Sequence, residues 1–269
     1  MILVTGATDG LGKRVARDLA STGATLLLHG RSEERAGTAV REIREETGND
    51  ALRYYLADFS YLDEVRRMSE EVSAGHDHLD VLVNNAGIGA GGRGDTERDL
   101  SRDGHELRFA VNYLAPFLLT RLLLPLLRRS VPARIVNVAS AGQSPVDFHD
   151  PMLERSYDGM RAYSQSKLAQ VMFTFDLAEE LAGTGVTVNA LHPASLMDTK
   201  MVFEAFGSAM STVQEGADAT VRLAAAPELE GVTGKYFDGE QEAQADAQAY
   251  DREARQALRR LSEDLTGLA

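Results

Sequence analysis

A short apolar run at residues 2–4 leads directly into a glycine-rich turn and then into a helical pattern. The turn carries Gly6, Gly10 and Gly12, and the apolar positions after it recur at the spacing of one helix face. Because glycine has no side chain, the backbone amides at the start of this helix can approach an anion closely. The order strand, turn, helix therefore predicts a pyrophosphate-binding unit, with the spacing Gly-x-x-x-Gly-x-Gly rather than the more common Gly-x-Gly-x-x-Gly. The residues expected to line it are Gly6, Thr8, Asp9, Gly10, Leu11 and Gly12.

The alternation of strand and helix continues along the chain. Further apolar runs typical of buried strands lie at residues 25–28, 52–57, 79–83, 134–139, 186–191 and 234–237, with helical patterns between most of them. Strands that alternate with helices form a parallel sheet, and ligands bind at the carboxyl ends of its strands. We therefore predict an α/β fold: one Rossmann-type domain over residues 1–269, with a doubly wound parallel sheet of about seven strands and helices on both faces.

Composition narrows the function classes. The chain has 269 residues, 43% of them hydrophobic, which is enough for one large core, and its middle holds no linker-like stretch. A formal net charge of -13 argues against nucleic acid and anionic membranes as partners. Cysteine is absent and the histidines form no ligand-spaced cluster, so we expect no metal site. Residues 1–6 run into a strand and no apolar run reaches the roughly 20 residues of a spanning helix, so we expect a cytoplasmic protein without a membrane anchor.

The end of the second strand bears on the choice of dinucleotide. An NAD site usually places an acidic residue there for the ribose 2′-hydroxyl, whereas this chain has Arg31 followed by Ser32. A guanidinium matches a 2′-phosphate in charge and geometry, so NADP(H) is favoured over NAD(H). Asp9 in the glycine turn opposes an extra phosphate, and Arg31 also fits a solvated helix start. At the end of the third strand, Asp58 and Phe59 are expected near the adenine, although Asp58 also fits a helix cap.

Tyr163 and Lys167 lie four residues apart in a segment with helical apolar spacing. Their side chains therefore project from one helix face as neighbours. A tyrosine with a pKa of about 10 is a poor acid or base at neutral pH, but a nearby cation favours the phenolate and lowers that pKa. The pair can then move a proton, although an isolated pair with this spacing is more often an ordinary surface feature.

Together these motifs resemble the short-chain dehydrogenase/reductase family, and more narrowly its retinol-dehydrogenase-like and carbonyl-reductase-like members. The glycine turn, the Asn-Asn-Ala-Gly at residues 84–87, Asn112, Ser140 and Tyr163-x-x-x-Lys167 occur in the family's order, over nearly the whole chain. The resemblance implies that Tyr163 protonates a carbonyl oxygen while a nicotinamide delivers hydride, and that Ser140 hydrogen-bonds that oxygen. It implies that Lys167 holds the nicotinamide ribose and that Asn112 anchors a water that relays protons to it. These roles agree with the chemistry of the residues themselves.

Further cofactor contacts are expected in later parts of the chain. The contacts implied are Asn85, Ala86, Gly87, Tyr163, Lys167, Pro193, Ala194, Ser195 and Thr199. The chain departs from the family in two places. The family's Pro-Gly after the sixth strand is Pro193-Ala194 here, which bears on the backbone next to the nicotinamide. The separation of Ser140 from Tyr163 is longer than in compact members, and we expect the insert at residues 143–159 to wall one side of the substrate pocket.

Apolar segments near these motifs suggest the substrate side of the site. Residues 195–211 are rich in methionine and phenylalanine with few charges, which predicts an adaptable lid over an apolar substrate, with an ordinary core helix as the alternative. The expected substrate contacts are Ser140, Gly142, Phe148, Met197, Met201 and Phe203. Residues 241–265 predict an acidic, alanine-rich helical tail.

The predicted function is that of an NADP(H)-dependent carbonyl reductase or alcohol dehydrogenase for a small apolar substrate. An NAD-linked dehydrogenase, a related dehydratase or epimerase, and a dinucleotide-binding sensor or scaffold without turnover remain as alternatives. The intact set of Asn112, Ser140, Tyr163 and Lys167 argues against the sensor, which needs only the cofactor half. Family members commonly pair through two helices, at residues 107–129 and 163–182 here, so we expect a homodimer or homotetramer, although core burial also explains their apolar surfaces.

Overall fold

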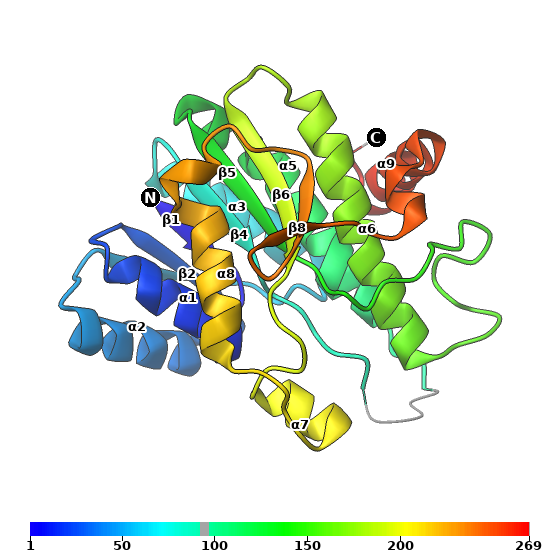
Figure 1. The fold of residues 1–269 in the computed structure, drawn as a ribbon, viewed down its shortest axis with the longest axis horizontal. Helices are drawn as coiled ribbons and strands as arrows, with labels where there is room; N and C mark the ends of the chain where they lie inside the picture. Colours follow the sequence, from blue (N-terminus) through cyan, green and yellow to red (C-terminus); the bar gives the residue numbers. More distant parts are fainter. Residues whose placement is uncertain (92–96, 269) are drawn as a thin grey trace.

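Eight strands form one sheet in the computed structural model, which describes residues 1–91 and 97–268 (Figure 1). Their order is β3-β2-β1-β4-β5-β6-β7-β8, and all neighbours are parallel except β7 and β8. The chain changes direction across the sheet between β1 and β4, which is where doubly wound folds bind their ligands. The strands are β1 (Ile2–Val4), β2 (Leu26–Gly30), β3 (Leu52–Leu56), β4 (Val81–Asn84), β5 (Ala133–Val138), β6 (Val186–His192), β7 (Lys235–Asp238) and β8 (Gln241–Ala243). The predicted fold class is confirmed.

Helices connect these strands, and polar caps start several of them. The side chains of Asp9, Ser32, Asp158, Thr212 and Asp251 each accept a hydrogen bond from a first-turn amide. The helices are α1 (Gly10–Ala20), α2 (Glu33–Thr47), α3 (Leu62–Gly75), α4 (Leu107–Phe109), the π-helical turn η1 (Ala110–Leu114), α5 (Ala115–Arg129), α6 (Gly159–Glu180), α7 (Lys200–Phe206), α8 (Val213–Ala225), the 3-10 turns η2 (Pro227–Leu229) and η3 (Ala247–Tyr250), and α9 (Arg252–Thr266).

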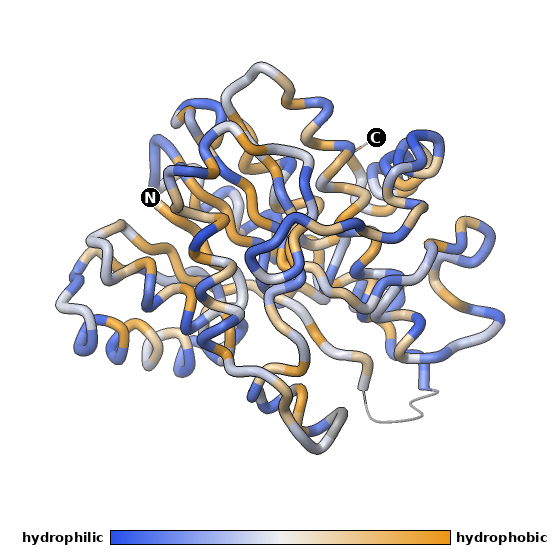
Figure 2. Tube along the Cα trace, viewed as in Figure 1, coloured by the Kyte–Doolittle hydropathy of each residue, from blue (hydrophilic) through white to orange (hydrophobic). Residues whose placement is uncertain are grey.

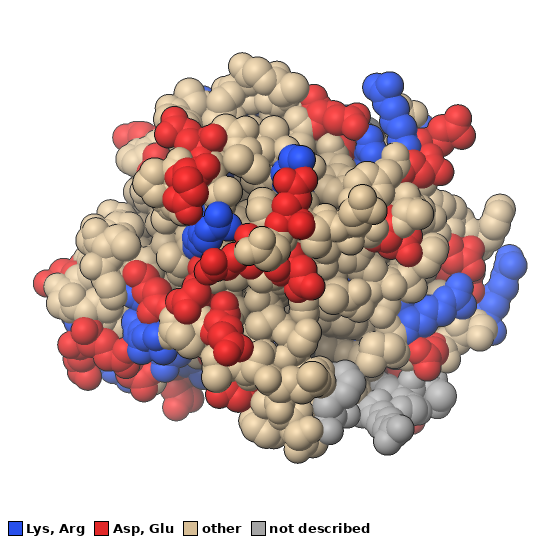
Figure 3. All heavy atoms as spheres, viewed as in Figure 1, with Lys and Arg blue, Asp and Glu red and all other residues tan. Residues whose placement is uncertain are grey.

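Helices cover both faces of the sheet, so both faces are buried. Neighbouring residues of a strand point to opposite faces and therefore pack into different cores. In β1, Leu3 packs into a core with residues of α3, α5 and α6. Ile2 and Val4 pack into a second core with residues of α1, α2 and α8. Hydrophobic residues accordingly follow the strands through the interior, while hydrophilic residues concentrate on the outer helices and loops (Figure 2). Acidic side chains spread over the face in view, in keeping with the net charge of -13 (Figure 3).

The continuous helix α4-η1-α5, residues Leu107–Arg129, is long and apolar enough to cross a membrane by length and composition. Among the described residues it is the one helix with these properties, and its most apolar stretch is 83% buried inside the fold. Burial against the sheet and neighbouring helices is what a core helix of this composition shows.

The predicted helical tail over residues 241–265 is wrong at its start. Gly239 adopts a left-handed φ of +57° and reverses the chain after β7, so residues 241–243 pair antiparallel with β7 as β8. Asp251 then caps α9 by accepting from the amides of Glu253 and Ala254. The helix therefore begins at Arg252, and the sheet has one strand more than about seven.

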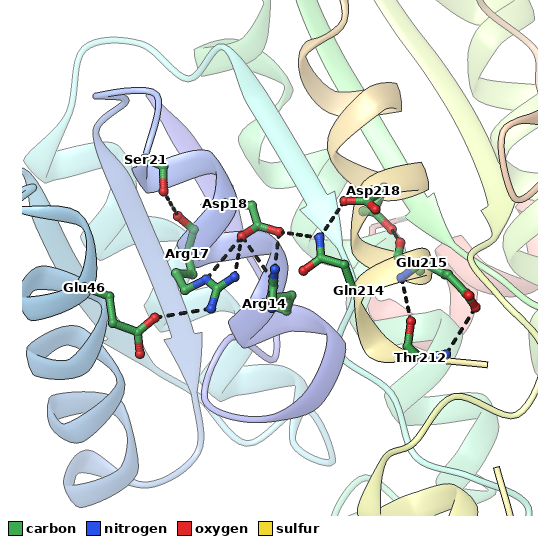
Figure 4. Close-up of polar contacts among 11 residues, drawn as sticks. Arg14, Arg17, Asp18, Ser21, Glu46, Thr212, Gln214, Glu215 and Asp218 are labelled. Atoms are coloured by element: carbon green, nitrogen blue, oxygen red, sulfur yellow. Dashed lines mark hydrogen bonds and ion pairs between the residues drawn. The ribbon is translucent and has the colours of Figure 1, made fainter. Parts of the chain in front are cut away.

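A polar cluster around Asp18 fastens α8 to α1 (Figure 4). Both carboxylate oxygens of Asp18 accept from Arg14 Nε, at 3.0 and 3.1 Å, and Arg17 adds bonds of 3.1 and 3.2 Å. Gln214 Nε2 of α8 donates to the same carboxylate at 3.2 Å and also to Asp218. One carboxylate thus joins the helix that follows the glycine turn to the helix that follows residues 195–211.

The close approach of α8 to the site depends on Gly216. A Cβ atom at this position would lie 2.4 Å from Met197 Sδ and 3.3 Å from both Leu11 and Pro193. A larger residue here would push α8 away from the glycine turn and from the segment after β6.

The C-terminal helix α9 packs on α6 and η1. Leu258 is 1% exposed, and Tyr113 shares a hydrogen bond of 2.6 Å with Ser262. Arg259 Nε donates to Asp176 of α6 at 2.6 Å. Part of the outer surface of the two long helices is therefore covered by the chain itself.

The predicted homo-oligomer would pair through α5 and α6, and α9 occupies part of that surface. The homodimer or homotetramer stays a prediction, and we expect α9 to weaken the pairing because it covers part of the face that a second copy would contact. Light scattering at several concentrations measures this. Arg259→Glu, which repels Asp176 and loosens α9, should increase self-association. A parental dimer that persists on dilution would support the pairing prediction, and a parental monomer would contradict it.

Candidate active site

A continuous cavity of about 860 Å³ lies at the carboxyl ends of β1, β2, β4, β5 and β6. Every residue predicted to contact the cofactor lines it, although their contact with a cofactor stays a prediction. These residues are Gly6, Thr8, Asp9, Gly10, Leu11, Gly12, Arg31, Ser32, Asp58, Phe59, Asn85, Ala86, Gly87, Tyr163, Lys167, Pro193, Ala194, Ser195 and Thr199. Ser140 and Gly142 line the same space. The strand ends therefore gather the predicted motifs into one site.

The glycine turn packs directly against the end of β4. Gly6 has a φ of +65°, and a Cβ on Gly12 would lie 2.3 Å from both the Gly6 oxygen and Asn85 Nδ2. Asn85 Nδ2 donates to the carbonyl of Thr5 at 2.8 Å, and Thr5 Oγ1 accepts from the amides of Asn85 and Ala86, each at 2.9 Å. The turn needs glycine at these positions because no room remains for side chains.

Positive charge gathers at the β2 end of the cavity. Arg31 is exposed, lines the cavity and forms no ion pair with any described residue. Arg35, one helical turn later, also lines it and pairs with Asp9, with Nη2 2.9 Å from Oδ2. This ion pair offsets the negative charge of Asp9, which opposes the binding of an extra phosphate. The effect is modest because both side chains are exposed. Arg35 was not predicted; its spacing of four from Arg31 is the signal that could have found it.

Asp58 and Phe59 lie where expected in the cavity wall. Asp58 Oδ1 accepts from the amide of Ser60 at 2.9 Å, and the N-cap of α3 is Tyr61, so Asp58 is not that helix's cap. Burial raises the pKa of Asp58, but hydrogen bonds with Ser60 and the charge of Arg31 outweigh it, and the net shift is downward. Asp58 therefore faces the cavity as a carboxylate.

His29 is a buried member of the site that the sequence prediction missed. Its Nδ1 accepts from the Gly6 amide at 3.1 Å, and its Nε2 lies 3.0 Å from the Ala57 carbonyl. The ring stacks on Phe59 with centroids 4.1 Å apart. This pattern requires a neutral imidazole with its proton on Nε2, and burial lowers the pKa of His29 to about 4. A histidine at the end of an apolar strand was the available signal.

Tyr163 of α6 and Ser140, which follows β5, both line the cavity, and Ser140 is close enough to lower the pKa of Tyr163. The Gly142 amide donates to Ser140 Oγ at 3.1 Å and so orients the hydroxyl. Burial raises the pKa of Tyr163, and the neighbouring Ser140 hydroxyl lowers it only in part, so the net shift is upward. The expected lowering of this pKa by Lys167 stays a prediction.

Lys167 is directed to other acceptors. Its Nζ lies 5.8 Å from the Tyr163 ring centroid and donates to the Val138 carbonyl at 2.9 Å and to Gln170 Oε1 at 3.1 Å. Burial lowers the pKa of Lys167 to about 8. Tyr163 and Lys167 are thus neighbours on one helix face, as predicted, with the ammonium held beneath the phenol by backbone and amide oxygens.

Asn112 is fully buried in η1, and its amide is fully used. Oδ1 accepts from the Ile88 amide at 2.8 Å, and Nδ2 donates to the Ile88 carbonyl at 3.1 Å and to Ser166 Oγ at 3.0 Å. A Cβ on Gly87 would lie 3.2 Å from Asn112 Oδ1. Asn112 therefore ties the segment after β4 to α6; its part in a proton relay stays a prediction. Single π-helical turns are frequent at functional sites.

Only some of the predicted substrate contacts line the cavity, and their contact with a substrate stays a prediction. Met197 lines the cavity, together with Ser140 and Gly142. Phe203 is 50% exposed and Phe148 packs against the core, so neither lines it. The side chain of Met201 lies outside the described residues. Apolar lining residues that were not among the predicted substrate contacts are Ile88, Ala90, Val111, Met160, Leu196 and Val202.

The insert at residues 143–159 contributes no lining residue, so the prediction that it walls the pocket is wrong. Its apolar side chains Phe148 and Met152 pack on the core. Gln165 of α6 holds its backbone, accepting from Asp147 N at 3.0 Å and donating to Pro151 O at 2.7 Å. The insert folds onto α6 because its apolar side chains are more stable when buried against the core than when exposed in the cavity.

Comparison with known proteins agrees with the geometry. A family described as "short chain dehydrogenase" matches residues 1–209. The chain belongs to the short-chain dehydrogenase family. It is 39% identical over 285 residues to Retinol dehydrogenase 13 of Mus musculus, covering 100% of this chain and 84% of that protein. It is 37% identical over 294 residues to Retinol dehydrogenase 14 of Homo sapiens, covering 99% and 86%. The resemblance to retinol-dehydrogenase-like members is confirmed.

Solved structures show the same fold. A short chain dehydrogenase from Shigella flexneri complexed with NADP superposes with a TM-score of 0.73 at 27% identity, covering 89% of this chain and 96% of that one. The RhlG/NADP active-site complex of Pseudomonas aeruginosa gives 0.71 at 27% identity, covering 88% and 93%. This short-chain dehydrogenase therefore shares its architecture with proteins that were crystallised with NADP.

His29 makes the stability of this dehydrogenase depend on pH. Between the ordinary pKa of 6.5 and the folded value of about 4, the unfolded chain binds a proton that the folded chain excludes. The contribution is complete above pH 6.5, and stability falls as the pH decreases toward 4, by about 2 kcal/mol at pH 5. Urea unfolding at pH 7 and pH 5 should show this loss in the parent and not in His29→Asn. His78→Asn, at a half-exposed histidine, is the control and should retain it.

Proposed function

We propose that this chain is an NADP(H)-dependent oxidoreductase that interconverts a carbonyl and an alcohol on an apolar substrate. The observation that carries the proposal is that a partly buried tyrosine and a serine line the same continuous cavity as a glycine cradle and an arginine with no ion pair to any described residue. Tyr163 and Ser140 supply the acid and the oxyanion partner, and Gly12 and Arg31 mark the dinucleotide end. Membership of the short-chain dehydrogenase family supports the same reaction class.

The residues present fit a nicotinamide dinucleotide. The glycines at positions 6, 10 and 12 leave the start of α1 free of side chains. At Gly12 no other residue fits, because a Cβ would collide with the turn. The N-terminus of α1 favours an anion such as a pyrophosphate. Arg31 and Arg35 at the end of β2 provide donors for a 2′-phosphate, which supports NADP(H) over NAD(H). When bound, NADPH supplies the hydride.

In the proposed reduction, Tyr163 donates its phenolic proton to the carbonyl oxygen, and the Ser140 hydroxyl donates a hydrogen bond to the same oxygen. Burial raises the pKa of Tyr163, which keeps the phenol protonated at neutral pH as an acid requires. Lys167 lies beneath it and adds positive charge that stabilises the phenolate left after transfer. The Gly142 amide fixes the Ser140 oxygen so that its proton is free to point into the cavity.

The substrate proposed is a medium-sized apolar aldehyde, ketone or alcohol. Aliphatic side chains line part of the cavity that Tyr163 also lines, among them Ile88, Val111, Met160 and Leu196. An apolar wall with only two or three polar groups orients the reacting oxygen and leaves the rest of the substrate to hydrophobic contact. The similarity to proteins named retinol dehydrogenases supports substrates of retinoid-like character.

Residues 195–211 are proposed as the lid of this site. The two ends of the segment are joined, because Asp198 N donates to Ser211 O at 3.1 Å and Met210 N donates to Leu196 O at 2.9 Å. The segment thus forms a closed loop whose base lines the cavity through Leu196 and Met197.

We also propose that the protein acts in the cytoplasm without a membrane or nucleic-acid partner, on the ground of its acidic charge.

Tyr163→Phe separates an enzyme from a sensor. The variant keeps the ring and the cavity but loses the proton, so turnover of a carbonyl panel with NADPH should fall by about a hundredfold or more. The dissociation constant of NADPH, measured by fluorescence titration, should change little. Unchanged turnover would contradict the mechanism, and NADPH binding without turnover in the parent would favour the sensor.

The choice of coenzyme is tested at the β2 end. Arg31→Ala should weaken NADPH binding by about tenfold to a hundredfold, since a charge-assisted hydrogen bond contributes about 1.5–3 kcal/mol, and should leave NADH binding unchanged. Asp9→Asn, which removes the countercharge of Arg35, should strengthen NADPH binding slightly. Parallel titrations with both coenzymes measure this. Tighter NADH binding by the parent would favour the NAD-linked alternative.

A further inference from the structure

Arg108 is a buried arginine that the proposed mechanism does not use. It lies in α4, is only 4% exposed, and directs its guanidinium to the pocket wall that follows β4. Nε donates to the Gly89 carbonyl at 3.0 Å, and Nη2 donates to the Ala90 carbonyl at 2.8 Å. Gly89 and Ala90 both line the cavity. A buried cation that binds two successive carbonyls of a pocket wall fixes the path of that wall.

Asn112 lies four residues further along the same helical segment and binds the preceding residue of the wall. Its side chain bonds both the amide and the carbonyl of Ile88. Asn112 and Arg108 therefore hold Ile88, Gly89 and Ala90 in sequence, from positions about one turn apart. The segment after β4 has no strand or helix of its own at these residues, so side chains supply its hydrogen bonds.

The other side of the guanidinium reaches the segment that leads into α6. Nη1 of Arg108 donates to Tyr157 Oη, and the guanidinium carbon lies 5.8 Å from the Tyr157 ring centroid. The Tyr157 hydroxyl donates in turn to Glu106 Oε1 at 3.2 Å. Tyr157 immediately precedes Asp158, the cap of the helix that carries Tyr163. The guanidinium thus joins the pocket wall to the start of the Tyr163 helix.

Glu106 balances the buried charge. It is 1% exposed, its Oε1 lies 3.5 Å from Arg108 Nη1, and its Oε2 accepts from the Phe109 amide at 2.7 Å as the cap of α4. A buried pair of this kind contributes little net stability, because desolvation offsets the attraction, whereas removing one partner is strongly destabilising. The main effect of the Arg108–Glu106 pair is therefore on the geometry of the pocket wall rather than on the free energy of unfolding.

We propose that Arg108 is a positioning residue of the active site, which holds the wall Ile88–Ala90 against the substrate space and in register with the helix of Tyr163. The proposal rests on the proposed function. It predicts that loss of the guanidinium loosens this wall and weakens productive binding of the carbonyl substrate, while the dinucleotide cradle at the far end of the cavity is unaffected.

The test uses a double variant that leaves no unpaired buried charge. Arg108→Met with Glu106→Gln removes both charges and retains similar side-chain volumes. The matched control is Arg121→Met with Glu180→Gln. Arg121 lies on α5 with its guanidinium 5.6 Å from the Phe117 ring centroid and 2.7 and 2.8 Å from the Glu180 oxygens, but it does not line the cavity. Each double variant therefore deletes one arginine–glutamate pair: a buried pair that contacts the pocket wall, and a less buried pair away from it.

Two readouts separate positioning from stability. Hydrogen exchange at the amides of residues 88–91 should accelerate by about tenfold or more in the Arg108 double variant, as expected when hydrogen bonds to a charged donor are lost. With an accepted carbonyl substrate, KM should rise by about tenfold while the NADPH dissociation constant stays within about threefold. The control should leave the exchange of this segment and KM as in the parent.

Tyr157→Phe supplies a milder variant if the double variant does not fold. It keeps the ring over the guanidinium, removes the bonds of the hydroxyl to Arg108 and Glu106, and should accelerate exchange of the wall by a smaller factor. Melting temperatures that fall while exchange at residues 88–91 and KM stay parental would overturn the proposal. If the parent neither binds NADPH nor reduces any carbonyl, the proposed function fails, and hydrogen exchange alone still decides whether Arg108 holds the wall.

Discussion

The contact between the glycine turn and the end of β4 is the constraint on which the site depends. Gly12 lies so close to the Gly6 carbonyl and to Asn85 that a Cβ would overlap both. The Asn85 amide and the Thr5 hydroxyl then join β1 to β4 at the point where the strand order reverses. Because the sheet is parallel, the same edge also receives the ends of β2, β5 and β6. The proposed acid, the cations and the anion cradle therefore share one cavity.

Burial sets the protonation of the titratable groups around this cavity. It keeps His29 neutral and able to accept from Gly6, lowers the pKa of Lys167 to about 8, and raises that of Tyr163. In each case the cost of burying a charge is the largest contribution, ahead of any neighbouring charge. The site therefore holds a protonated phenol above a lysine whose ammonium is bound by carbonyl and amide oxygens, an arrangement suited to giving a proton to a substrate oxygen.

Helical side chains hold the parts of the site that lack regular structure. Asn112 and Arg108 bond successive residues of the segment after β4, and Gln165 bonds the backbone of the insert before α6. Elsewhere in the fold, Asp18 of α1 joins that helix to α8. In each case one polar side chain on a helix satisfies the backbone or side-chain groups of another segment, so the rigid helices determine the positions of the cavity walls.

The sequence by itself determined the fold class and the position of the site. Apolar runs, helical spacing and the glycine turn are local signals, and a parallel sheet brings its strand ends together whatever the details of packing. This is why Arg31, Ser140, Tyr163 and the glycines line the cavity as predicted. Only the tertiary structure decided what depends on contacts distant in the sequence. Phe148 lies outside the cavity because it packs on the core, and β8 forms because Gly239 reverses the chain. His29 and Arg35 line the cavity, and Arg108 contacts its wall, because the fold brings partners that are distant in the sequence within hydrogen-bonding distance.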